Sequence, residues 1–143
     1  MAATRHVYEI YLRTTLARAW AALTRFDTVK RYYYGYGLRT TLRKGAPLQY
    51  VNPESGEVAI AGEVLAVVPR RRFVHTFQFQ HGKSREPASR VTWELERQGK
   101  VVKLTLVHDR LARSPRTARS VRGGWGPILS GLKTLLETGR PLF

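Results

Sequence analysis

Apolar residues recur at helical spacing near the end of the chain, across residues 123–139. Their steps of three, one, three, three and one place them on one face of a helix. The stripe comprises Trp125, Ile128, Leu129, Leu132, Leu135 and Leu136. Gly139 followed by Pro141 is a typical helix stop. We therefore predict one long C-terminal helix, and burial of its stripe against a sheet would contribute roughly 9 to 18 kcal/mol before chain entropy is subtracted.

Most of the remaining chain alternates apolar and polar residues as β-strands do. The first strand is predicted at residues 6–13, with Tyr8, Ile10 and Leu12 on its core face. Further strands are predicted at 38–42, 47–51, 58–68, 72–80, 89–97 and 101–108. Connections within this region are short and carry no helical pattern, so neighbouring strands should pair antiparallel.

Two short helices are predicted between the first and second strands. Thr14 and Thr15 can cap the segment LARAWAALTRF, which has an amphipathic pattern. Thr24 followed by Asp27 has the form of a second capping box and predicts a short helix that runs into Arg31. Residues 112–122 are polar and basic, and we predict a mobile loop there. The expected fold class is α+β, with a curved antiparallel sheet of about six or seven strands wrapped around the long C-terminal helix.

The alternation of apolar and polar residues along each predicted strand also assigns side chains to the two faces of the sheet. The core face carries Phe73, His75, Phe77, Phe79, Val91, Trp93, Leu95, Leu104, Leu106 and His108. The opposite face carries Thr76, Gln78, Thr92, Glu94, Lys103 and Thr105, which suits solvent. We predict a cavity in which the helix residues Trp125, Ile128, Leu129 and Leu132 face Phe77, Trp93, Leu106 and His108. Leu135 and Leu136 should meet solid core instead.

Composition limits the class of protein. The chain has 143 residues, of which 43% are hydrophobic and 24% charged, and we predict one folded domain over residues 1–143. There is no cysteine, no apolar run long enough for a membrane span, and no signal-peptide pattern, so a cytoplasmic location is expected. The net charge of +15 comes mostly from dispersed arginines. We interpret it as a solvated basic surface rather than a nucleic-acid site.

Candidate chemistry is sparse. The sequence contains no nucleophile elbow, Walker loop or metal-ligand spacing, so no catalytic residue, metal or cofactor is predicted. His75 and His108 are either core histidines bonded on both ring nitrogens or polar groups inside an apolar cavity. The tyrosines of RYYYGYG, among them Tyr33 and Tyr36, either plug the end of the core or line a pocket mouth. Trp125, beside three glycines at the predicted helix start, has the same two interpretations.

Four segments in this order resemble a known family: YEIYLRTTLARAWAALT, GEVLAVVPRRRFVHTF, SRVTWELERQGKVVKLTLVHD and GGWGPILSGLKTLLETG. The chain resembles the START-like, or SRPBCC, helix-grip superfamily, in the branch related to the C-terminal domain of the heat-shock protein 90 ATPase activator (AHSA-like). The resemblance implies a cavity between sheet and helix, used in the superfamily for lipids, sterols or polyketides. Where relatives commonly have tryptophans after the second helix, this chain has Tyr32, Tyr33 and Tyr34.

Three functions are compatible with the sequence. The first is non-catalytic binding of a small hydrophobic molecule, for which the basic surface would suit an anionic group. The second is general acid–base catalysis of the polyketide cyclase or dehydratase type with His75 or His108. The third is a protein-interaction or stress-response module resembling the chaperone activator, as monomer or dimer. The cavity residues expected to bind the ligand are Tyr33, Tyr36, His75, Phe77, Trp93, Leu106, His108, Trp125, Ile128, Leu129 and Leu132.

Overall fold

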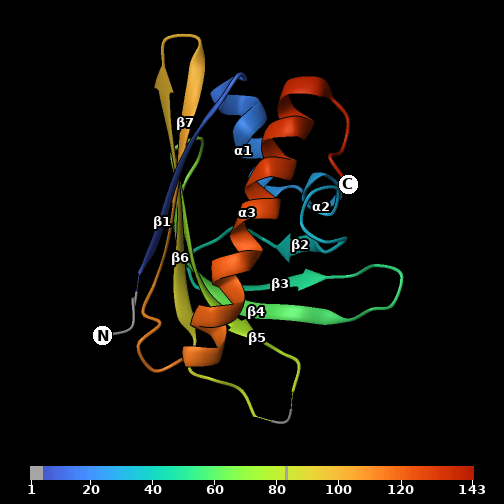
Figure 1. The fold of residues 1–143 in the computed structure, drawn as a ribbon, viewed down its shortest axis with the longest axis vertical. Helices are drawn as coiled ribbons and strands as arrows, with labels where there is room; N and C mark the ends of the chain where they lie inside the picture. Colours follow the sequence, from blue (N-terminus) through green and yellow to red (C-terminus); the bar gives the residue numbers. More distant parts are fainter. Residues whose placement is uncertain (1–4, 83) are drawn as a thin grey trace.

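A seven-stranded antiparallel sheet and a long helix make up most of the computed structural model, which describes residues 5–82 and 84–143 (Figure 1). The strands lie in the order β1-β7-β6-β5-β4-β3-β2. Their bounds are β1 His6–Leu12, β2 Gly37–Thr40, β3 Pro47–Val51, β4 Val58–Val68, β5 Arg72–Phe79, β6 Ser89–Gln98 and β7 Val101–Asp109. The predicted α+β helix-grip architecture is confirmed. Residues 1–4 and Lys83 of the predicted 1–143 domain lie outside the described part.

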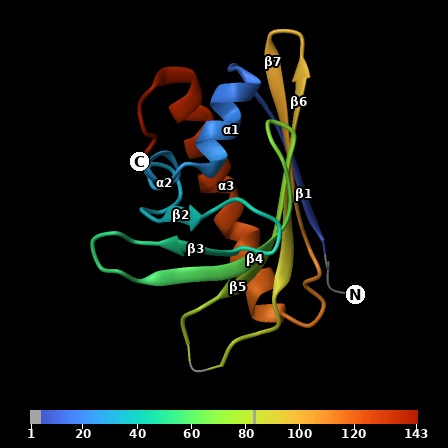
Figure 2. The ribbon, with the colours of Figure 1, turned by 180° about the vertical axis from the view of Figure 1, so that it is seen from behind.

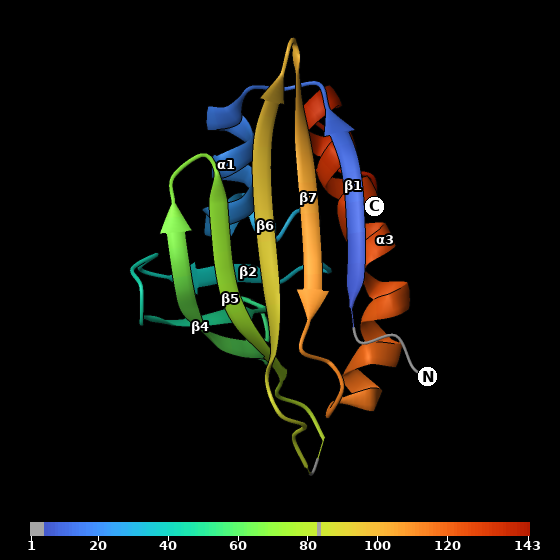
Figure 3. The same ribbon diagram turned by 90° about the vertical axis from the view of Figure 1, so that its left-hand side faces the viewer.

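The long helix α3 spans Pro115–Thr138 and lies along one face of the sheet (Figure 3). The predicted start at residue 123 is therefore wrong, and so is the loop predicted at 112–122 from Pro115 onward. Proline is favoured in the first helical turn, where its missing N–H needs no partner. Thr117 and Val121 are both buried and extend the apolar stripe backward from Trp125 in steps of four. Gly139, with a φ of 77°, ends the helix as predicted.

Two short helices follow β1 and lie beside α3, as the reverse view shows (Figure 2). Helix α1, Leu16–Thr24, is capped by Thr15, whose hydroxyl accepts the Arg18 N–H at 3.2 Å. Helix α2 is a single turn, Phe26–Val29. The second capping box predicted at Thr24 is wrong, because its hydroxyl donates back to the Trp20 carbonyl at 2.8 Å instead of capping α2.

The core lies between the concave face of the sheet and α3, and the predicted core face of the central strands is buried there. One assignment on the other face is wrong. Thr92 is buried rather than solvent-exposed, because it lies at the centre of the sheet between Val74 and Val107 on the neighbouring strands. The sheet bends where β4 passes β5. A Cβ on Gly62 would lie 2.1 Å from the Thr76 carbonyl oxygen, so this close approach requires glycine.

Candidate functional site: a pocket beside the long helix

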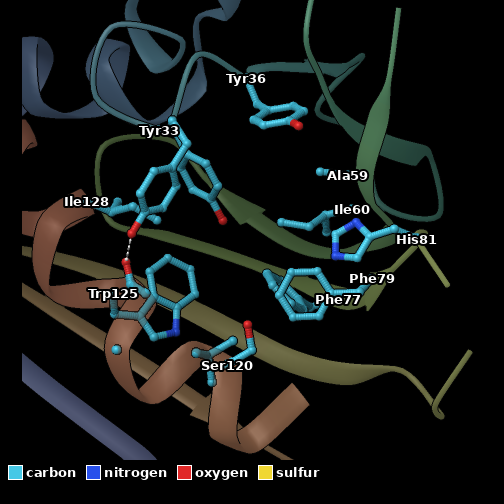
Figure 4. A pocket seen from close by; sticks show the side chains of 14 residues that line it. Tyr33, Tyr36, Ala59, Ile60, Phe77, Phe79, His81, Ser120, Trp125 and Ile128 are labelled. Atoms are coloured by element: carbon cyan, nitrogen blue, oxygen red, sulfur yellow. Dashed lines mark hydrogen bonds between the residues drawn. The ribbon is translucent and has the colours of Figure 1, made fainter. Parts of the chain in front are cut away.

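A pocket of about 430 Å³ opens between the N-terminal half of α3 and the β4–β5 part of the sheet (Figure 4). The segment before β2 covers a third side with three tyrosines. Aromatic and aliphatic side chains make up most of the wall, and the pocket is within the size range of small-molecule sites. The lining residues are Tyr33, Tyr34, Tyr36, Ala59, Ile60, Phe77, Phe79, His81, Ser120, Val121, Gly123, Gly124, Trp125 and Ile128.

The structure brings five of the predicted cavity residues together in this pocket: Tyr33, Tyr36, Phe77, Trp125 and Ile128. The other six are packed in the core beneath it and do not line it: His75, Trp93, Leu106, His108, Leu129 and Leu132. The indole rings of Trp125 and Trp93 meet edge to face, with centroids 5.6 Å apart. This contact fills the space where the cavity was predicted. The hollow lies to one side, toward Ile60 and Phe79.

Tyr34 also lines the pocket and belongs to the tyrosines for which a pocket mouth was one of two interpretations. Eight lining residues were not anticipated: Ala59, Ile60, Phe79, His81, Ser120, Val121, Gly123 and Gly124. Ser120 and Val121 were missed because residues 112–122 were assigned to a loop. The sequence did carry a signal that the helix extends to this segment, since Ser120, Gly124 and Ile128 follow one another in steps of four and share a helix face. Ser114 followed by Pro115 also marks a helix start. For Ala59 and Ile60 we find no comparable local signal.

His108 lies at the centre of a buried chain of hydrogen bonds. The Trp125 indole N–H donates to its Nδ1 at 3.0 Å, and Nε2 lies 2.7 Å from the Ser89 hydroxyl. Ser89 in turn donates to the Phe77 carbonyl at 3.2 Å. Because an indole only donates, the imidazole is neutral with its proton on Nε2. Burial, together with the neighbouring His75 and His6, lowers the pKa of His108 to about 3.

His75 is held in a similar way by the other central tryptophan. The Trp93 indole N–H donates to Nε2 at 3.4 Å, and Nδ1–H donates to the Thr76 carbonyl at 2.7 Å. Burial lowers the pKa of His75 to about 4, against the opposing effect of the Thr76 bond. Both ring nitrogens of each histidine are therefore bonded within the protein. This arrangement matches the expectation of core histidines rather than that of polar groups facing a ligand.

The tyrosines around the pocket differ in what their hydroxyls contact. Tyr32 donates to the Ala22 carbonyl at 2.7 Å, Tyr34 to the Gly124 carbonyl at 2.9 Å, and Tyr36 to the Glu57 carboxylate. Tyr34 thereby ties the segment before β2 to the middle of α3. Tyr33 is buried, and its ring stacks on Tyr50 with centroids 4.4 Å apart. Within residues 5–82 and 84–143, no hydrogen-bond partner of the Tyr33 hydroxyl is present.

A carboxylate from the β5–β6 loop caps the end of α3 that borders the pocket. Glu86 accepts the Arg116 backbone N–H at 3.0 Å, and the Thr117 backbone N–H and hydroxyl at 2.7 Å and 2.9 Å. Its pKa is lowered because these hydrogen bonds and the Arg116 guanidinium outweigh burial. Ser114, at the N-cap position, instead donates to the Pro87 carbonyl at 2.6 Å. The pocket-side end of the helix is therefore fixed by residues from a distant loop.

Residues 5–82 and 84–143 contain neither a cluster of metal ligands nor a membrane-spanning helix. No group of three or more metal-ligating side chains is found there. No helix among those residues is long and apolar enough to cross a membrane.

Several proteins of known structure share this fold. CalU16 from Micromonospora echinospora has a TM-score of 0.77 at 20% identity, over 96% of this chain and 76% of that one. The BPP1335 protein of Bordetella parapertussis has a TM-score of 0.72 at 28% identity, covering 99% and 78%. The Aha1 protein of Colwellia psychrerythraea, which forms a dimer, has a TM-score of 0.74 at 16% identity, covering 94% and 97%.

No curated protein matches the sequence significantly. Residues 13–137 match the family described as Activator of Hsp90 ATPase homolog 1-like protein, which is most of the chain. This match, together with the helix-grip fold, confirms the resemblance derived from the four sequence segments. The chain therefore belongs to the Activator of Hsp90 ATPase homolog 1-like protein family.

Proposed function

We propose that this protein binds a small hydrophobic, largely aromatic molecule in the pocket beside α3. The observation that carries the proposal is the pocket itself, about 430 Å³ of space walled by aromatic and aliphatic side chains at the junction of helix and sheet. Five residues selected from the sequence alone meet in its wall. Its exposed polar lining residues, His81 and Ser120, border a smaller groove that contains Arg85 and Arg116. Glu86 lines the same groove and pairs with Arg116 at 3.5 Å, so Arg85 is the group there that suits a ligand with an anionic outer end.

The geometry supports binding better than acid–base catalysis by the buried histidines. His75 and His108 do not line the pocket, and each has both ring nitrogens bonded to protein atoms. A general base must come within hydrogen-bond reach of the proton that it removes. Neither imidazole can do so without breaking its bond to a central tryptophan.

The test fills the pocket without disturbing the core. A Cβ built on Gly124 meets no atom within 4 Å, and its position in the row Ser120, Gly124, Ile128 directs a side chain into the pocket. We expect Gly124→Leu to fold with equal or greater stability, because leucine favours helix by up to about 1 kcal/mol over glycine. It should also abolish binding. Ser130→Leu is the matched control, since Ser130 is exposed on α3 and lies outside the pocket.

Binding is measured with naringenin, palmitate and 8-anilinonaphthalene-1-sulfonate. Thermal stabilisation, amide chemical shifts and tryptophan fluorescence provide three independent readouts. Ligand at a hundred times its dissociation constant should add about 2.7 kcal/mol of stability. The proposal fails if no probe stabilises the wild-type protein, or if Gly124→Leu binds as well as Ser130→Leu.

A further inference from the structure

One polar group of the pocket wall, the Tyr33 hydroxyl, makes no hydrogen bond to the described residues. Tyr33 is only 4% exposed, yet it lines the pocket, and its hydroxyl points into the open space (Figure 4). The neighbouring tyrosines 32, 34 and 36 all donate to protein oxygens. Among residues 5–82 and 84–143, by contrast, the Tyr33 hydroxyl has no hydrogen-bond partner. The hydroxyl oxygen is not one of the enclosed unpaired atoms, which are His6 Nε2 and Thr14 Oγ1 in the described part of the chain, so it opens to the pocket and can bond to a ligand atom there.

The ring of Tyr33 is held firmly, so the direction of its hydroxyl is set by the fold. One face stacks on Tyr50, with centroids 4.4 Å apart and an interplanar angle of 17°. Trp125 meets it edge to face, with centroids 6.1 Å apart and an interplanar angle of 88°. A phenol positioned by two aromatic neighbours loses little rotational freedom when a ligand binds. It is therefore a preorganised donor in an otherwise apolar wall.

We propose that the Tyr33 hydroxyl donates a hydrogen bond to a carbonyl oxygen at the inner end of the bound molecule, which makes aromatic ketones and quinones the preferred ligand class. This inference rests on the proposed binding function and specifies its ligand. A carbonyl oxygen accepts and cannot donate, so it complements a lone phenol O–H. Burial, with a smaller contribution from Tyr50, raises the pKa of Tyr33 well above its ordinary value, so the hydroxyl keeps its proton.

The experiment compares two ligands of nearly equal shape, 2-acetylnaphthalene and 2-isopropylnaphthalene, by titration of tryptophan fluorescence and by calorimetry. Only the first carries a carbonyl oxygen. Tyr33→Phe keeps the stacked ring and removes the hydroxyl alone. We expect this variant to bind the ketone about tenfold more weakly, as one lost hydrogen bond implies, and the hydrocarbon within twofold of wild type.

Tyr50→Phe is the matched control variant. Tyr50 belongs to the same stack and is equally buried, but it does not line the pocket. It should leave the affinity for both ligands within twofold. Equal losses for ketone and hydrocarbon in Tyr33→Phe, or an unchanged ketone affinity, would overturn the assignment of Tyr33 while leaving the binding function intact. Failure of both ligands to bind the wild-type protein would overturn the inference and count against the binding function as well.

Discussion

Acidification from pH 7 to pH 5 should destabilise this protein through its two core histidines. In the native state, burial keeps His75 and His108 neutral, with pKa values of about 4 and about 3. In the unfolded chain each has a pKa near 6.5 and takes up a proton as the pH falls below that value. Since the unfolded state then binds more protons than the native state, the free energy of unfolding decreases. The loss begins near pH 6.5 and continues down to the native pKa values.

The size of this destabilisation follows from the difference between pH 5 and the pKa of histidine in the unfolded chain. One pH unit corresponds to 1.36 kcal/mol, so each histidine contributes about 2 kcal/mol of destabilisation at pH 5 and the pair about 4 kcal/mol. Carboxylates contribute little in this window, because their ordinary pKa values lie below it. A loss of about 4 kcal/mol is a large share of the stability of a typical domain.

The assay is urea unfolding at pH 7 and pH 5, followed by tryptophan fluorescence. His75→Gln should halve the pH-dependent loss, because it removes one of the two buried imidazoles. Histidine NMR signals supply a second readout, since the ring protons of His75 and His108 should not shift between pH 7 and pH 5 in the folded protein. Native-state titration of either ring near pH 6.5, or equal stability at both pH values, would refute the reasoning.

Four substitutions test the packing around the pocket by chemical denaturation. Gly62→Ala should destabilise the protein by at least about 2 kcal/mol, because its methyl group would meet the Thr76 carbonyl at 2.1 Å; a neutral effect would contradict this close approach. Glu86→Ala should remove about 1 to 2 kcal/mol and speed amide exchange in the first turn of α3, and unchanged exchange would argue against capping. Leu136 lies in solid core, so Leu136→Ala should lower the free energy of unfolding by about 2 to 5 kcal/mol. Ile128 lies at the pocket wall, so Ile128→Ala should lower it by less. Equal losses in the two variants would mean that the wall packs as tightly as the core.

The position of the void revises one expectation about α3. Leu129 was expected to border the cavity, whereas Leu136 was expected to meet solid core. It is 4% exposed and does not line the pocket, so Leu129→Ala should be as costly as Leu136→Ala. The helix is packed solidly along the face that carries Leu129. The neighbouring face, which carries Ile128, borders the pocket.

The sequence by itself determined the architecture of this protein. Period-two alternation along the strands and the 3.6-residue stripe from Trp125 to Leu136 arise from local geometry, so they are visible without knowledge of distant contacts. The same patterns located the core face of the sheet and the turn at Gly139. The helix start was missed, because the first turn of α3 is polar and is fixed by Glu86, about thirty residues away in the sequence.

Only the tertiary structure decided where the pocket lies and which side chains it holds. Alternation identifies the face that a residue occupies, but the space left between two faces depends on how side chains of particular volume fit together. The edge-to-face contact of Trp93 with Trp125 closes the predicted cavity, and the small residues Ala59 and Gly124 open a different one. The unpaired hydroxyl of Tyr33 likewise emerges only when segments far apart in the chain are brought together by folding.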